Sequence, residues 1–212
     1  MLATISRATA HDRDEIYRFW YTVYVEEMGR LEDDPHTNHA AATVSDPLYD
    51  SSTVMLARDE AQRVVATLIN TCAANADLGK YEALYGFQDK TAAERQQISI
   101  TTKLMVDPAF RRTRLPMLLA KKGYDLALAD GITEDYIDCN DHLIGFFTRM
   151  GYVPHLGRIE HPLYGVVNSM KVRLDDFDHL RAVRSPFAGP IPAPEAAPRK
   201  LATIKEAADH AA

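Results

Sequence analysis

The sequence has little cysteine and contains no long apolar run. Its two cysteines, Cys72 and Cys139, lie far apart and form no C-x-x-C pair. This pattern predicts buried, inert thiols and argues against a disulfide framework or a zinc site. No segment approaches the roughly 20 consecutive apolar residues that a membrane-spanning helix needs. Residues 1–15 are too rich in charge for a secretory signal, so we expect a cytoplasmic protein without a membrane span.

The sequence also lacks a positive net charge and several catalytic patterns. Its formal net charge is -6, which argues against nucleic acid as a partner. His36 and His39 have metal-ligand spacing, but no convincing third ligand accompanies them, so we predict no metal site. Ser51 and Ser52 lie outside a G-x-S-x-G context, which argues against a serine hydrolase.

What the chain does contain is enough apolar side chain for a folded core. Of its 212 residues, 46% are hydrophobic and 25% are charged, an ordinary balance for one globular domain. Prolines are frequent from residue 185 onward. We therefore predict a single domain over residues 1–184 and a proline-rich C-terminal tail over residues 185–212.

Hydrophobic periodicity predicts an α/β (α+β) fold. The predicted strands are 2–7, 53–58, 63–72, 98–106, 136–139, 152–159 and 166–174, and the predicted helices are 11–28, 77–85, 115–129, 142–150 and 175–183. The polar segment 30–52 is expected to be a long functional loop. This order predicts a mixed, mostly antiparallel sheet of about six to seven strands with helices on both faces, including one parallel crossover.

Two segments resemble the GCN5-related N-acetyltransferase superfamily. Residues 103–116 read KLMVDPAFRRTRLP, like that superfamily's strand ending in V-x-P, its R-x-x-G-x-G/A turn and its following helix. Residues 146–152 read FFTRMGY, like its later aromatic and glycine motif. The resemblance implies an N-acetyltransferase-like fold and an acyltransferase.

A closer resemblance is to the long-chain N-acyl amino acid synthases, which are related to the acyl-homoserine-lactone synthases. It is carried by residues 21–29, 46–50 and 102–106, with residues 162–165, Met170 and 178–180 adding to it. It implies transfer of a medium or long fatty acyl group from acyl carrier protein to the amine of an amino acid, such as tyrosine. Trp20, Thr22 and Ile69 stand where many relatives carry arginine, which leaves the acceptor open.

The turn after the central strand departs from that of coenzyme A users. Arg114 and Pro116 occupy the glycine positions, and proline supplies no N–H for a pyrophosphate. The neighbouring basic residues are Lys103, Arg111, Arg112, Arg114, Lys121 and Lys122, against Asp107 alone. This charge favours an acidic carrier-protein surface. Three alternatives stay open: a coenzyme A-dependent acetyltransferase, a non-catalytic ligand-binding module and, although much of its pattern is missing, an acyl-homoserine-lactone synthase.

The resemblance places the donor's phosphopantetheine arm along the central strand, with no permanently bound cofactor. The assigned acyl and pantetheine site is Lys103, Leu104, Met105, Val106, Arg111, Arg112, Arg114, Leu115 and Phe147. Because the strand ends near Pro108, backbone N–H groups around Leu104 to Val106 are expected to face the thioester.

Three residues are candidate proton acceptors. Glu26 and Glu27 end the aromatic helix beside the long loop, and His142 lies at a strand-to-helix turn. The alternative interpretations are a solvated helix end and a helix-start residue capped by Asn140 or Asp141.

Arg18, Tyr24 and Asp50 are assigned to binding of the small-amine acceptor. The aromatic stripe that includes Tyr24 is expected to be mostly core, with Tyr24 the member that reaches the site.

Overall fold

The computed structural model of the chain describes residues 3–31, 33–161 and 164–189. A sheet with the strand order β1-β4-β5-β6-β7-β9-β8 forms its centre. These strands are β1 (Thr4–Arg7), β4 (Thr53–Arg58), β5 (Val64–Cys72), β6 (Ile98–Val106), β7 (Glu134–Cys139), β8 (Val153–His161) and β9 (Gly165–Arg173). Every neighbouring pair is antiparallel except β6 and β7. The prediction of a mixed, mostly antiparallel sheet is confirmed.

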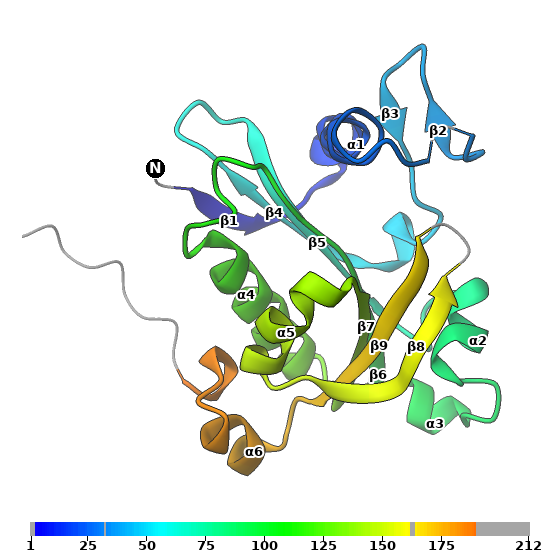
Figure 1. The fold of residues 1–212 in the computed structure, drawn as a ribbon, viewed down its shortest axis with the longest axis vertical. Helices are drawn as coiled ribbons and strands as arrows, with labels where there is room; N and C mark the ends of the chain where they lie inside the picture. Colours follow the sequence, from blue (N-terminus) through cyan, green and yellow to red (C-terminus); the bar gives the residue numbers. More distant parts are fainter. Residues whose placement is uncertain (1–2, 32, 162–163, 190–212) are drawn as a thin grey trace, which may run out of the picture.

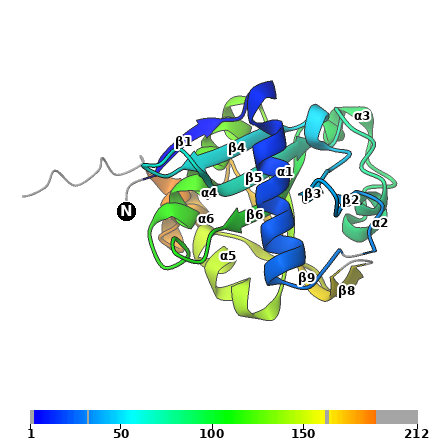
Figure 2. The ribbon, with the colours of Figure 1, turned by 90° about the horizontal axis from the view of Figure 1, so that it is seen from above.

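Helices cover both faces of the sheet (Figure 1). The α-helices are α1 (Arg13–Tyr21), α2 (Lys80–Tyr85), α3 (Ala92–Arg95), α4 (Leu115–Ala129), α5 (Ile144–Met150) and α6 (Phe177–Ala182). Helix α1 crosses the strands on one side, as Figure 2 shows from above, while α4 and α5 lie on the other side. Bounds of β6 and α4 agree with the predicted ranges, whereas the short α3 carried no clear sequence signal.

The period-2 pattern of β4 explains how the sheet separates two cores. Val54 and Leu56 belong to the cluster around Trp20 of α1. Met55 and Ala57, the alternate residues, belong to the cluster that includes α4. Successive side chains of a strand point to opposite faces of the sheet. Because β4 is apolar at consecutive positions, it is buried on both faces.

The first long helix differs from the regular helix predicted over residues 11–28. After α1 the chain continues as a π-helical turn, Thr22–Glu27, and the amide of Met28 donates to the carbonyl of Val23, five residues back. Such wide turns often occur at functional sites. Tyr24 lies within this turn and is buried.

The long polar segment contains structure that the sequence analysis missed. It holds the two-strand ribbon β2 (Thr37–Asn38) and β3 (Thr43–Val44), followed by a 3-10 turn at Tyr49–Ser51. Val44 and Tyr49 pack beneath α1. Two-residue strands leave no measurable period in a sequence, so the prediction of a loop without strands was wrong there.

The C-terminal boundary also differs from the predicted one. A 3-10 turn, Pro186–Ala188, follows α6. Phe187 is 5% exposed, and its ring stacks on Tyr124 of α4 at 4.4 Å. The hydroxyl of Ser185 donates to the carbonyl of Met150 at 2.6 Å. The packed region thus continues through residues 185–189, which the predicted tail had included.

Some predicted features lie outside the described residues: 190–212 of the proline-rich tail, Leu2 of the first strand, and the motif residues Pro162 and Leu163. Among the described residues, no helix is both long and apolar enough to cross a membrane. Cys139 is buried and Cys72 is partly buried, and both are free thiols.

Candidate active site

The sheet opens between β6 and β7. These parallel strands pair only from Ile98 to Ile100 of β6, opposite Glu134 to Tyr136 of β7. Beyond that point β7 continues to pair with β9 as far as Cys139, while β6 continues to pair with β5. The two strands therefore separate toward their C-terminal ends. Polar groups at the separating ends face one opening, a usual place for ligands in α/β sheets.

A β-bulge re-aims β6 at this opening. Lys103 and Leu104 together lie opposite Leu68, between the pairs formed by Thr102 and Met105. Lys103 has a φ of 52°, a left-handed conformation that is uncommon for a residue with a side chain. Bulges frequently redirect a side chain next to an active site, and here the redirected side chain is that of Lys103.

The side chain of Lys103 is buried between a carboxylate and two aromatic rings. Its ammonium pairs with the carboxylate of Asp46, and these two side chains are 9% and 8% exposed. The same ammonium lies 5.0 Å from the ring of Trp20 and 5.7 Å from the ring of Tyr24. A buried, fully paired lysine is a fixed group, so Lys103 serves to position the bulge and its neighbours.

Hydrogen bonding fixes the backbone next to the opening. The amide of Asp107 donates to the carbonyl of Val65 at 2.8 Å. Because bonded and non-bonded pairs alternate along an antiparallel ladder, the N–H of Val106 points away from β5, toward the side that β7 has left. The carbonyl of Val106 accepts from Nε of Arg111 at 2.7 Å. Val106 thus presents a fixed backbone donor to the opening.

The carboxylate of Glu27, a predicted proton acceptor, is held by Arg111. Two nitrogens of Arg111 donate to its two oxygens, each at 2.5 Å. The hydrogen bonds to Glu27 raise the pKa of Arg111. Glu27 therefore braces the turn that follows β6, and its contact with the opening runs through Arg111 and Val106.

Stacked aromatic rings form a wall beside Lys103. The hydroxyl of Tyr164 donates to that of Tyr24 at 3.0 Å, and their rings stack at 5.9 Å. The ring of His161 stacks on Tyr164 at 4.3 Å. Burial, with the charges of Lys80, Lys103 and Arg30 adding to it, lowers the pKa of His161 to about 4. Tyr24 thus lies among groups suited to a ring or hydrocarbon, and its role in acceptor binding stays a prediction.

Asp138 is a candidate that the sequence analysis missed. It lies on β7 two residues beyond the last β6 pair, and it is partly exposed. The hydroxyl of Tyr85 donates to its carboxylate at 2.7 Å. Burial raises the pKa of Asp138. The sequence does carry a signal for Asp138, because it is a carboxylate near the C-terminal end of a strand that follows a crossover. Only the turn after this strand was considered as part of a site.

A small cavity lies on the opposite face, between the sheet and helices α4 and α5. Its lining is mainly apolar and includes Leu68, Leu104, Gly123, Phe147, Met150 and Phe187. The predicted Leu104 and Phe147 thus share one cavity. The cavity has a volume of only about 20 Å³, so an acyl chain enters it only if the surrounding side chains move apart.

A buried carboxylate, Asp135, forms the polar part of this lining. It accepts hydrogen bonds from Ser99, Thr101 and Asn70, and from Tyr152 at 2.5 Å. Burial raises the pKa of Asp135 to about 6, although these hydrogen bonds act in the opposite direction. The cavity therefore has an apolar wall and one polar, titratable corner.

The turn between β6 and α4 lacks the geometry of a phosphate nest. From Asp107 to Leu118, all of which are described, no residue has a positive φ, whereas a nest needs left-handed residues or a glycine. The amide of Leu115 is already bonded to the hydroxyl of Thr113 at 3.1 Å. Within the turn, the amides of Thr113 and Leu115 are therefore already bonded, and Pro116 has none to offer.

The predicted basic patch is smaller than expected. Lys103 is buried against Asp46, Lys121 pairs with Asp125, and Arg111 pairs with Glu27. These three charges are compensated locally. Arg112, Arg114 and Lys122 remain exposed, so half of the predicted residues can meet a partner surface.

The structure does not bring the remaining predicted residues into the opening. Asp50 pairs with Arg13 and is 71% exposed. Arg18 lines a surface hollow together with Glu27 and Asp107. Glu26 is exposed at the end of the π-helical turn.

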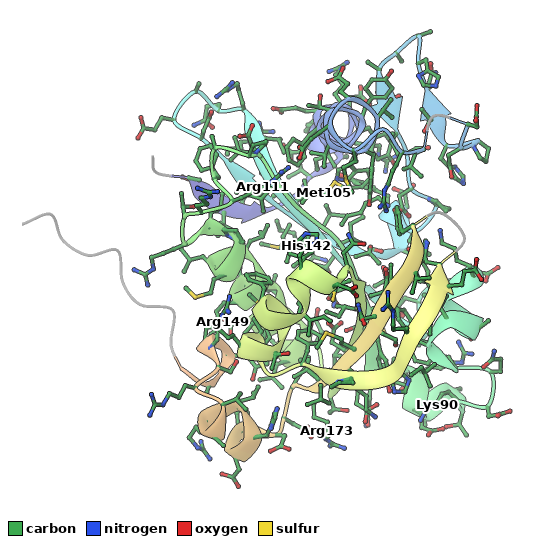
Figure 3. All side chains as sticks on the ribbon, viewed as in Figure 1. Lys90, Met105, Arg111, His142, Arg149 and Arg173 are labelled. Atoms are coloured by element: carbon green, nitrogen blue, oxygen red, sulfur yellow. The ribbon has the colours of Figure 1, made fainter. Side chains whose placement is uncertain are left out.

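His142 is exposed in the 3-10 turn Asp141–Leu143, which leads into α5. Figure 3 labels it with Met105 on β6 and Arg111 in the following turn. Among the described residues, no group of three or more His, Cys, Asp or Glu side chains is arranged to hold a metal ion.

Comparisons with known proteins agree with this architecture. The family model described as N-acyl amino acid synthase FeeM matches residues 15–175. The structure of FeeM, an N-acyl amino acid synthase from uncultured soil microbes, superposes with a TM-score of 0.64 and 13% identity, covering 88% of this chain and 97% of that chain. No curated protein sequence matches the chain.

Two further solved structures share the fold. The CoA-dependent acyl-homoserine lactone synthase MesI has a TM-score of 0.63 and 17% identity, covering 85% of this chain and 95% of that chain. An acetyltransferase of the GNAT family from Staphylococcus aureus Mu50 has a TM-score of 0.57 and 15% identity, covering 82% of this chain and 100% of that chain. The expected N-acetyltransferase-like fold is confirmed.

Proposed function

The chain belongs to the N-acyl amino acid synthase FeeM family of acyltransferases, and from this premise we propose that it moves a medium or long fatty acyl group from acyl carrier protein to the amine of an amino acid. The observation that carries the proposal is the opening between β6 and β7. One side of it holds the apolar cavity with Leu104 and Phe147. The other side holds the aromatic wall with Tyr24 and Tyr164. A donor and an acceptor can therefore meet at the bulge.

The chemistry follows from the groups at this meeting point. The amine nitrogen attacks the thioester carbonyl, a C–N bond forms, and the oxygen takes the negative charge of the tetrahedral intermediate. The N–H of Val106 is the donor proposed to stabilise that oxygen. The intermediate collapses with loss of the C–S bond, and the departing thiolate takes up a proton that the amine has released. The protein holds the two substrates in place and provides one fixed hydrogen-bond donor, the N–H of Val106. The thioester provides the activated acyl group.

The donor assignment is supported by the turn after β6. Pro116 has no N–H, the amide of Leu115 is occupied by Thr113, and no residue of the turn has a positive φ. These features disfavour a diphosphate. A phosphopantetheine arm attached to a carrier protein has no diphosphate, so it does not need such a turn. Arg112, Arg114 and Lys122 are exposed and suit an acidic carrier surface.

The acyl chain is proposed to enter beside Leu104, between the sheet and α4, where the small cavity must widen to admit it. The walls of the cavity come from α4, α5 and the sheet, so the chain would leave the thioester near the bulge and run beneath β6. Gly123 of α4 faces Leu68, where an added Cβ would come within 3.0 Å. Side-chain size at this position is therefore expected to set the length of chain that fits.

The test supplies the purified chain with matched acyl-carrier-protein and acyl-coenzyme A donors of several lengths, and with a mixture of amino acids. Mass spectrometry detects amides, and free-thiol titration detects donor cleavage. We expect amides from the carrier-protein donors, with a KM at least tenfold below that of the coenzyme A donors. Absence of amide with every donor would refute acyl transfer. A preference for acyl-coenzyme A would replace the carrier-protein assignment.

A charge-reversal pair sharpens the donor test. Arg112→Glu and Arg114→Glu together are expected to raise KM for the carrier-protein donor about tenfold, because like charges then face each other. The effect should shrink in high salt. Lys90→Glu, just before α3, is the control, since Lys90 pairs with Glu94 at 3.1 Å, away from the turn. Equal effects of both changes would contradict docking at this turn.

A further inference from the structure

Asp138 and Lys80 place opposite charges beside the opening. Asp138 is held by Tyr85 of α2 at 2.7 Å, and Lys80 is the first residue of the same helix. The positive charge of Lys80 acts on Asp138, and the ammonium of Lys80 lies 5.3 Å from the ring of Tyr81. Both charged groups thus belong to the aromatic side of the opening.

Neither charge is used by the fold in an ion pair. In the described part of the chain, no carboxylate lies within ion-pair distance of Lys80 and no cation lies within that distance of Asp138. Among the described side chains, Asp138 accepts a hydrogen bond only from the neutral hydroxyl of Tyr85. By contrast, the nearby Lys103 is fully paired with Asp46. A carboxylate and an ammonium that face one opening without pairing are complementary to a zwitterion.

We propose that this pair binds a free α-amino acid as the acceptor, with its ammonium on Asp138 and its carboxylate on Lys80. This assignment rests on the proposed acyl transfer and specifies its acceptor site. The neighbouring rings form one aromatic group, because Tyr24 stacks on Tyr164 and both Tyr81 and Tyr164 contact His161. Such a surface favours an aromatic or large apolar side chain.

Asp138 has a chemical role as well as a binding role in this arrangement. One proton passes from the acceptor's ammonium to the Asp138 carboxylate, which frees the nitrogen lone pair for attack. After the C–N bond forms and the C–S bond breaks, a second proton passes from the nitrogen to the departing thiolate. The products are a neutral amide and a thiol. Asp138 returns its proton to solvent. An α-amino group has a pKa near 8, and burial raises the pKa of Asp138, so the two pKa values approach each other.

The charges around Lys80 agree with a carboxylate-binding role. Partial desolvation, with the charge of Lys103 adding to it, lowers the pKa of Lys80. An arriving carboxylate would restore the stability of its charged form. Glu27, another carboxylate considered as a proton acceptor, is already bound to Arg111.

The experiment compares L-phenylalanine with phenethylamine, which is the same amine without the carboxylate. Wild-type enzyme, Lys80→Met and Asp138→Asn are assayed for amide formation, with Asp89→Asn and Lys90→Gln as matched controls. Asp89 is exposed and Lys90 lies on the α3 side. Asparagine keeps the acceptor for Tyr85, so Asp138→Asn is expected to fold, and urea unfolding checks this.

We expect Lys80→Met to raise KM for phenylalanine at least tenfold and to leave KM for phenethylamine within twofold. Asp138→Asn should lower kcat about 100-fold with both amines. The assignment is overturned if Lys80→Met affects both amines equally, or if folded Asp138→Asn keeps its kcat.

Calorimetry of phenylalanine binding separates this assignment from the proposed reaction. If the wild type binds phenylalanine, Lys80→Met does not, and no donor yields an amide, then acyl transfer is refuted and the acceptor site is supported. Amide formation that is indifferent to both substitutions would support acyl transfer and refute the acceptor site.

Discussion

The hydroxyl of Thr67 donates a hydrogen bond to the carbonyl oxygen of Lys103 at 3.1 Å. Thr67 lies on β5 and is completely buried, and it also accepts from the indole nitrogen of Trp20 at 2.9 Å. One hydroxyl therefore joins α1 to the bulge of β6. Because Lys103 holds a left-handed conformation, this bond supports the backbone at the point where the donor and acceptor are proposed to meet.

Replacing Thr67 with valine should destabilise the chain and lower its activity. Valine has nearly the same shape but cannot bond Trp20 or Lys103, and a buried donor left unpaired costs about 1–3 kcal/mol. We expect the free energy of unfolding in urea to fall by that amount, and kcat to fall about tenfold as the bulge shifts. Thr67→Ser keeps the hydroxyl and should retain most of kcat. Equal kcat values for the two variants would show that the hydroxyl does not position the bulge.

His161 should make stability increase with pH. Burial, with the charges of Lys80, Lys103 and Arg30 adding to it, lowers its pKa to about 4, whereas an unfolded histidine has a pKa near 6.5. Between these values the unfolded chain binds more protons, so the free energy of unfolding rises with pH, by no more than about 3 kcal/mol. His161→Phe should remove this rise in urea titrations at pH 4 to 7. Exposed His11→Gln should not change it.

Asp135 should act in the opposite direction over an overlapping range. Burial raises its pKa to about 6, above the value near 3.9 of an unfolded aspartate. The folded chain then binds more protons between these values, so the contribution of Asp135 to the free energy of unfolding falls as pH rises. Asp135→Asn should therefore steepen the rise attributed to His161. A slope identical to that of the wild type would contradict the raised pKa.

Much of the fold was readable from the sequence because its strands and longer helices carry strong periods. Segment 98–106 is apolar and β-rich and ends before Asp107-Pro108, and segment 115–129 begins with an N-terminal proline. The failures share one physical cause, which is that tertiary contacts decided the local structure. Thr43–Val44 is a strand because it packs under α1, and Phe187 is core because Tyr124 offers it a ring.

Phe187 should prove essential for stability although it lies in the segment predicted as a tail. It is 5% exposed and stacks on Tyr124 at 4.4 Å. Truncating a buried phenylalanine to alanine costs about 3–5 kcal/mol, and we expect this loss for Phe187→Ala in urea unfolding. Phe177→Ala is the matched control, because Phe177 is 44% exposed and should cost under about 1 kcal/mol. Similar losses for both would place the end of the packed region before residue 185.

Glu27 and Arg111 should behave as one unit in catalysis. Arg111 bonds both the carboxylate of Glu27 and the carbonyl of Val106, so loss of either side chain frees the turn. We expect Glu27→Gln and Arg111→Gln each to lower kcat about tenfold, and the double variant to lower it no further. Additive effects would instead support an independent role for Glu27, as a proton acceptor that contacts the amine.

The site was less readable than the fold because its members meet only through topology. Lys103, Val106 and Tyr24 stand in motifs, so the sequence could propose them as site residues. Asp138, Lys80 and His161 come from three separate segments, and nothing in a single sequence shows that α2 lies against β7 and the β8–β9 end. Arg18 and Asp50 were assigned from their types in promising segments, but their side chains face solvent.

The turn between β6 and α4 has a consequence for how such enzymes diversify. A phosphate-cradling turn depends on glycines, so almost any exchange there strains the main chain. Here every residue from Asp107 to Leu118 has an ordinary backbone conformation. Exchanges at exposed positions such as Arg112 and Arg114 therefore cost no backbone strain, and the charge of this surface can change by point mutation without rebuilding the main chain beneath.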